Sequence, residues 1–117
     1  MVSWEVEFYE TETGVKCVQD YLDAIDNVKL KAKVLNDIAL LKQFGTELQM
    51  PHARRLEDGI WELRTKQSSN IARTLYFTVS NKKIILLHGF IKKTQKTPPA
   101  ELERAKTNKK DYIRRHS

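Results

Sequence analysis

The sequence is poor in cysteine, glycine and proline. Of its 117 residues only Cys17 is a cysteine, so no disulfide can form within the chain. This excludes a small secreted domain built on disulfides and favours a reducing compartment, the cytoplasm. The four glycines and three prolines mark no linker or repeat, and the length predicts a single domain over residues 1–117.

Long apolar runs are also missing. The longest runs from Ile84 to Leu87, whereas a membrane-spanning helix needs about 20 apolar residues. The charged, alternating start of the chain is not typical of a signal peptide. We therefore expect a cytoplasmic protein without a membrane partner.

Several enzyme signatures are absent as well. The chain has no glycine-rich phosphate loop, no His-Glu-x-x-His and no pair of Cys-x-x-Cys motifs. Its three histidines, His52, His88 and His116, lie in separate segments without the spacing of metal ligands. We therefore expect no metal and no cofactor, and we interpret Cys17 as a small, partly buried apolar residue.

Positive charge is abundant and unevenly distributed. Residues 1–26 carry a net charge of −6, whereas residues 27–91 and residues 92–117 each carry +6. Such a basic C-terminal part suggests a polyanion partner such as nucleic acid, although a solvated basic helix gives the same count. If the partner is nucleic acid, the acidic stretch 1–26 should lie away from it.

Hydrophobic periodicity predicts an α+β fold in the order strand, helix, helix, three strands, helix. The predicted strands cover residues 3–9, 60–66, 71–79 and 84–91, with a turn at 80–83. The predicted helices cover residues 15–25 and 30–41, the second ending at Gly45, and a third begins at Thr97-Pro98-Pro99. We expect a mostly antiparallel, twisted sheet with the N-terminal helical hairpin and the C-terminal helix packed on one face. The opposite face can then hold a site.

Charged side chains on neighbouring strands form the candidate site. Strand alternation places Glu62, Arg64 and Lys66 on one face, and Arg73 occupies an otherwise apolar parity of the next strand. Three lysines follow the last strand of the meander: Lys92, Lys93 and Lys96. If the strands are neighbours, these groups converge at one end of the sheet.

Two interpretations of this cluster remain open. Arginine grips phosphate bidentately, and RNA supplies its own nucleophile in the 2′-hydroxyl, so the cluster suits metal-free RNA cleavage. Alternatively, Glu62, Arg64 and Arg73 form a structural ion-pair network. The same choice applies to three rings, Tyr76, His88 and Phe90, which either stack on splayed bases or pack in the core.

Three segments together resemble the phage-derived, HigB-like branch of the RelE/ParE toxin superfamily. They are Gly59-Ile60-Trp61-Glu62-Leu63-Arg64, Ile71-Ala72-Arg73-Thr74-Leu75-Tyr76-Phe77 and residues 87–98, of which Phe90-Ile91-Lys92-Lys93-Thr94-Gln95-Lys96-Thr97-Pro98 is the most specific part. The resemblance covers nearly the whole chain. It implies a RelE-like fold and the role of toxin in a type II toxin–antitoxin system.

The resemblance also implies an activity and partners. The activity is endonucleolytic cleavage of mRNA on the ribosome, without a metal, leaving a 2′,3′-cyclic phosphate and inhibiting translation. The partner is a HigA-like antitoxin with a helix-turn-helix domain, in a heterotetrameric complex. Operator DNA is then bound only indirectly, through the antitoxin.

Functional residues follow from the same resemblance. Arg64 matches a basic strand position, Arg73 the arginine that contacts the scissile phosphate, and Lys93 the group that stabilises the leaving oxygen. Glu62 departs from the pattern, standing where a lysine is frequent, and no tyrosine follows the lysine segment. The general base is therefore open between Glu62, a lysine with a lowered pKa and His88. The predicted RNA-binding residues are Lys66, His88, Phe90, Lys92 and Lys96.

Two other functions remain open. A ParE-like inhibitor of DNA gyrase shares this fold but generally lacks the basic residues. A non-catalytic nucleic-acid-binding module would use the same cluster only to position phosphates.

Overall fold

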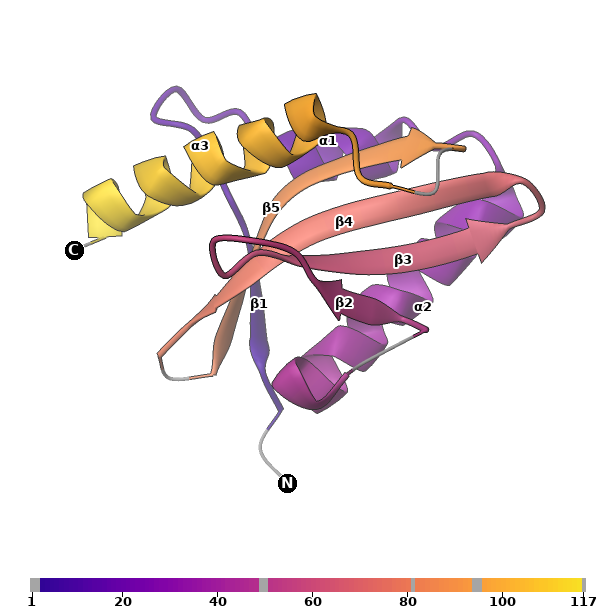
Figure 1. Ribbon diagram of the computed structural model, residues 1–117, viewed down its shortest axis with the longest axis horizontal. Coiled ribbons are helices and arrows are strands. Elements are labelled where there is room, and N and C mark those ends of the chain that lie inside the picture. Colours follow the sequence, from indigo (N-terminus) through magenta and orange to yellow (C-terminus); the bar gives the residue numbers. More distant parts are fainter. Residues whose placement is uncertain (1–2, 49–50, 81, 94–95, 117) are drawn as a thin grey trace.

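The computed structural model describes residues 3–48, 51–80, 82–93 and 96–116. Within these residues, five strands form one mixed sheet and three α-helices pack against it (Figure 1). The strands are β1 (Glu5–Phe8), β2 (Ala53–Arg55), β3 (Trp61–Gln67), β4 (Asn70–Val79) and β5 (Lys83–Lys92). The helices are α1 (Cys17–Asp23), α2 (Val28–Phe44) and α3 (Pro99–His116), with a 3₁₀ turn η1 (Gly45–Glu47) after α2.

The predicted α+β class is confirmed, and the sheet is mostly antiparallel. Its spatial order is β1-β5-β4-β3-β2, with β1 parallel to β5 and every other pair antiparallel. The three strands of the meander begin and end within one residue of their predicted bounds. The predicted turn at 80–83 includes Asn81, which lies outside the described residues. The prediction lacked β2, because a three-residue strand is too short to show alternation.

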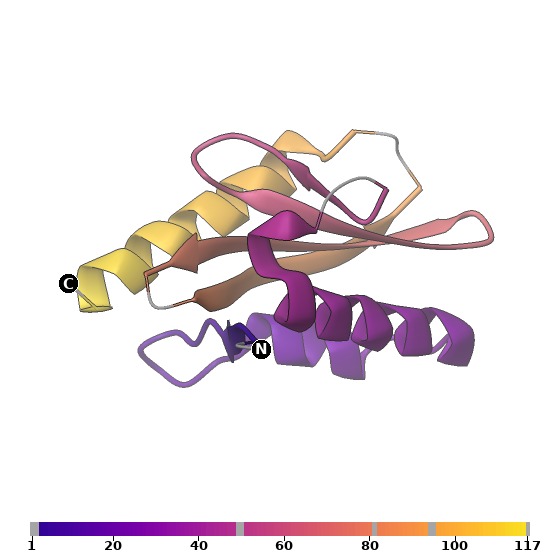
Figure 2. The same cartoon turned by 90° about the horizontal axis from the view of Figure 1, so that it is seen from below.

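Helices lie on both faces of the sheet (Figure 2), and each face has its own apolar layer. The α1–α2 hairpin packs on one face against Leu86 and Ile84, while α3 packs on the other against Ile85 and Leu87. The expectation that all helices share one face is therefore wrong for α3. The reason lies in β5, whose central residues are apolar on both parities and need cover on both sides.

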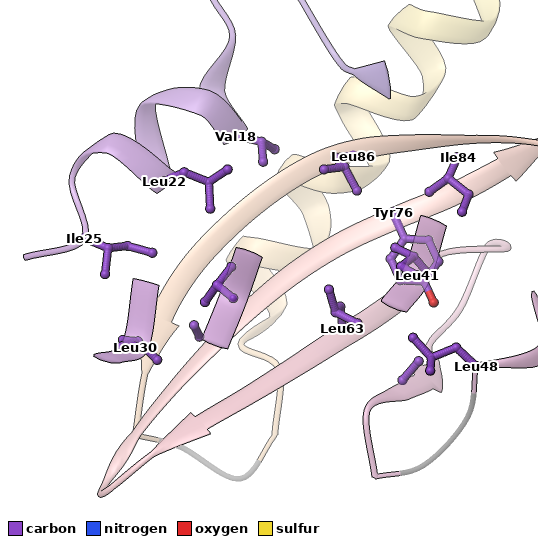
Figure 3. Close-up of a cluster of buried hydrophobic side chains, with 13 residues drawn as sticks. Val18, Leu22, Ile25, Leu30, Leu41, Leu48, Leu63, Tyr76, Ile84 and Leu86 are labelled. Atoms are coloured by element: carbon purple, nitrogen blue, oxygen red, sulfur yellow. The ribbon is translucent and has the colours of Figure 1, made fainter. Parts of the chain in front are cut away.

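The larger apolar layer lies under the hairpin (Figure 3). Val18 and Leu22 of α1 and Leu30 and Leu41 of α2 are buried there against the sheet. The α2 helix begins where the Asn27 side chain accepts a hydrogen bond from the Leu30 amide (3.0 Å). It ends at Gly45, as predicted, and the positive φ of 56° there suits glycine.

The second layer lies under α3. Ala105 and Tyr112 of this helix pack against Phe77 and Leu87 of the sheet. The first turn of α3 reaches the end of the sheet where β3 and β4 carry charged side chains. Across the described residues, none of the helices is both long and apolar enough to cross a bilayer.

Gly89→Ala should destabilise the fold by about 1–3 kcal/mol, because a methyl group there overlaps the ring of Tyr21 from α1. Urea unfolding of the single and double variants tests this contact. In a Tyr21→Ala background the added methyl group has room, so Gly89→Ala should lower the free energy of unfolding by less than it does in the wild type. An equal cost in both backgrounds would show that the packing of α1 on β5 differs from that described.

Candidate functional site

Three rows of paired residues cross β3, β4 and β5 on the face that α3 partly covers. The rows are Glu62–Leu75–His88, Arg64–Arg73–Phe90 and Lys66–Ile71–Lys92. Paired residues point to the same side of a sheet and successive rows are two residues apart, so all nine side chains share one face. We call these nine residues the basic face.

The carboxylate of Glu62 lies at the centre of an ion-pair cluster. Its oxygens are 3.2 Å from Nε of Arg54, 3.7 Å from Nε of Arg64 and 3.9 Å from Nε of Arg73. Glu62 and Arg73 are fully buried, whereas the side chains of Arg64 and Arg54 are 14% and 34% exposed. Three guanidinium groups around one carboxylate leave a local charge of +2, which only Arg54 and Arg64 present to solvent.

The strand register explains why this carboxylate is needed. Arg64 and Arg73 are direct cross-strand partners, and like charges in that position destabilise a sheet. Arg54 pairs with Glu62 from the other side. Burial lowers the pKa of the Arg73 guanidinium, and the attraction of Glu62 opposes that shift. Arginine remains protonated in proteins, so the cluster keeps its charge.

The segment between β5 and α3 closes over the cluster. The hydroxyl of Thr97 donates a hydrogen bond to Oε2 of Glu62. In the first turn of α3, Oε1 of Glu101 lies 2.8 Å from Nε2 of His88. These two contacts couple the position of α3 to the geometry of the charged residues.

The structure brings together most of the residues that the sequence singled out. All except Tyr76, Lys93 and Lys96 belong to the basic face, and the two lysines follow β5 with exposed side chains. The segment between them, Thr94-Gln95, lies outside the described residues.

The aromatic rings occupy different layers. Phe90 is 7% exposed and belongs to the apolar layer under α3, where its ring stacks on that of His88 at a centroid distance of 5.7 Å. Tyr76 points to the opposite side, into the layer under the hairpin, and so cannot reach a ligand on the basic face.

Arg54, Thr97 and Glu101 are the members of the site that sequence reasoning missed. Arg54 lies on the strand β2 that periodicity could not detect. Thr97 stands inside the motif that carries the family resemblance, but a lone threonine has no recognisable signal. Glu101 lies in the first turn of α3, where acidic residues are common at any helix, so its type gives no signal of a site.

No metal centre is evident in the part of the chain that the structure describes. No three residues among its histidines, cysteines, aspartates and glutamates are grouped so that they could hold a metal ion.

Comparison with known families gives one match. A family model described as "Phage derived protein Gp49-like (DUF891)" matches residues 20–110, which include the whole basic face. No curated protein matches the chain.

Glu62→Gln should lower the free energy of unfolding by about 3–5 kcal/mol, because it leaves three guanidinium groups without their shared counter-charge. Denaturant unfolding measures the loss. Adding Arg73→Met removes the most buried of the three cations and should recover part of it. If Arg73→Met lowers the free energy of unfolding as much in the Glu62→Gln background as in the wild type, the two residues are not coupled.

Proposed function

Because the chain belongs to the Gp49-like family of phage-derived proteins, a family associated with the toxins of toxin–antitoxin pairs, we propose that it is the toxin of such a pair. We further propose that it acts as an endoribonuclease on mRNA. Its partner is an antitoxin of the HigA-like, helix-turn-helix type, which neutralises it in a heterotetrameric complex.

The observation that carries this proposal is the basic face. A fixed local charge of +2 with two partly exposed guanidinium groups suits the phosphate backbone of RNA, because arginine binds phosphate oxygens with two parallel hydrogen bonds. Four exposed lysines surround the arginines at the same end of the sheet: Lys66, Lys92, Lys93 and Lys96. The fold thus offers a strongly positive surface at this end of the sheet.

The chemistry uses the substrate's own nucleophile. The 2′-hydroxyl oxygen attacks the adjacent phosphorus, the bond from phosphorus to the 5′-oxygen breaks, and a 2′,3′-cyclic phosphate remains. Arg64 and Arg54 hold the phosphate, and the fully buried Arg73, which shares the carboxylate of Glu62 with them, adds its charge from beneath the surface. Lys93 stabilises the leaving 5′-oxygen.

Glu62 and His88 have different roles in this proposal. Glu62 is fully buried, its Oε2 accepts the hydrogen bond of Thr97, and its Oε1 forms ion pairs with Arg54 and Arg64. It therefore acts as a positioning residue that fixes the arginines. His88 accepts the proton of the 2′-hydroxyl, because its ring is held through Nε2 by Glu101, and a carboxylate in that position stabilises the imidazolium that forms.

Mapping of RNA 5′ ends on a translated message, with and without ribosomes, tests the activity. The wild type should produce new ends that require ribosomes, as mRNA on the ribosome is the proposed substrate. Arg64→Ala should reduce them by about 10²–10³-fold, the usual effect of removing one group that stabilises the transition-state charge. Absence of new ends in the wild type would overturn the nuclease and leave gyrase inhibition or simple nucleic-acid binding.

Charge reversal on the opposite layer provides the matched control. Asp20 and Asp23 lie on α1 with exposed side chains, on the face of the sheet away from the arginines. The double variant Asp20→Lys, Asp23→Lys should therefore cut within about threefold of the wild type. A loss as large as that of Arg64→Ala would show that RNA contacts α1.

A further inference from the structure

A hollow of about 400 Å³ lies beside the basic face, between α2 and the far end of β3. Eight described residues line it: Lys33, Asn36, Asp37, Pro51, His52, Arg64, Thr65 and Lys66. Its size is within the range of pockets that hold small ligands. Arg64 belongs both to this hollow and to the cluster around Glu62.

The hollow exists because β2 is shorter than the strand it pairs with. In the described residues, the last backbone hydrogen bond along this edge runs from the Arg64 amide to the carbonyl of His52 (2.7 Å). Beyond it, no described strand pairs with β3 on this side. Backbone groups alternate along a strand, so the amide and carbonyl of Lys66 face the same edge as those of Arg64. Nζ of Lys33 reaches that carbonyl at 3.3 Å.

The lining combines several basic residues with one acid, Asp37, which already has partners of its own. Asp37 is buried and accepts a hydrogen bond from the hydroxyl of Thr65 (2.7 Å), and its other oxygen lies 3.8 Å from Nδ1 of His52. The exposed ammonium groups of Lys33 and Lys66 face no second acid among the lining residues. The hollow therefore favours an anion.

We propose that this hollow binds a nucleotide of the RNA strand that flanks the cut, an inference that rests on the proposed nuclease function. Lys33 and Lys66 bind its phosphate, and the exposed amide of Asn36 contacts its base edge, since an amide offers both a donor and an acceptor. Arg64 joins the two sites, so one strand continues from the arginine cluster around the edge of β3.

The side-chain chemistry of the lining favours RNA over a protein partner. More of the lining surface is apolar than polar, but seven of the eight lining residues carry a charged or hydrogen-bonding group. Pro51 is the sole apolar residue among the described ones that line the hollow. A docking site for a protein segment needs apolar anchors at its centre. Phosphate and base edges instead need cations and amide groups, which this hollow supplies.

Binding of a short RNA with 2′-O-methyl groups throughout, which cannot be cut, tests the proposal. Lys33→Gln should weaken binding about tenfold. It should also make the negative slope of log K against log salt shallower by about 0.7, the value for one phosphate contact in a single strand. Lys42→Gln, also exposed on α2 but outside the hollow, is the matched control and should change binding less than twofold. Thermal unfolding of both variants checks that the fold is intact.

Asn36→Leu tests the base contact separately. The wild type should bind uncleavable oligonucleotides that differ in one flanking base with different affinities, and Asn36→Leu should bind them with equal affinity.

NMR spectra locate the bound RNA. On RNA addition, the amide chemical shifts of residues 33–37 and of Lys66 should change together with that of Arg64.

The outcomes separate this inference from the proposed function. Shifts confined to the arginine cluster, with Lys33→Gln no worse than Lys42→Gln, would overturn the nucleotide site while the nuclease stands. RNA bound in the hollow by a protein that cuts no message would overturn the nuclease alone. A lack of any RNA binding would overturn both.

Discussion

The buried carboxylate of Glu62 is the constraint on which the basic face depends. The register of β3 and β4 places Arg64 opposite Arg73, an arrangement that repels unless a negative charge lies between the two guanidinium groups. Glu62 supplies that charge and also binds Arg54. Desolvation of four charged groups offsets much of the attraction, so the cluster contributes fixed geometry more than stability. That fixed geometry is what a phosphate-binding site requires.

The two faces of the sheet differ in role: one carries most of the apolar core, and the other carries the charged residues. The α1–α2 hairpin covers one face with a continuous apolar layer, which supplies most of the buried core. On the other face α3 covers only part of the sheet, so that Lys66, Lys92 and part of Arg64 stay accessible on the basic face. Thr97, in the segment that links β5 to α3, and Glu101, in the first turn of α3, join the two parts, since both contact the basic face.

Alternation and helical periodicity predicted the meander, the hairpin and the shared face of Glu62, Arg64 and Lys66, because these patterns are local. The parallel pairing of β1 with β5 is long-range and left no local pattern. The apolar residues on both parities of β5 indicate cover on both faces, but no local pattern assigns that cover to α3. Net charge along the sequence also does not show which basic residues of the C-terminal part are already paired. Arg114 at the end of α3 forms an ion pair with Glu12 of the acidic N-terminal stretch, so that stretch neutralises part of the charge of α3.

Product chemistry on a defined RNA oligonucleotide tests the central claim most directly. Mass spectrometry of products from the unmodified oligonucleotide should show a 2′,3′-cyclic phosphate, and a single 2′-deoxy substitution at the cut nucleotide should abolish cleavage there. If cleavage requires ribosomes, the oligonucleotide is supplied as a message bound to the ribosome. Products with 3′-hydroxyl ends, or cleavage that persists at the 2′-deoxy position, would contradict a mechanism in which the basic face activates the substrate's own hydroxyl.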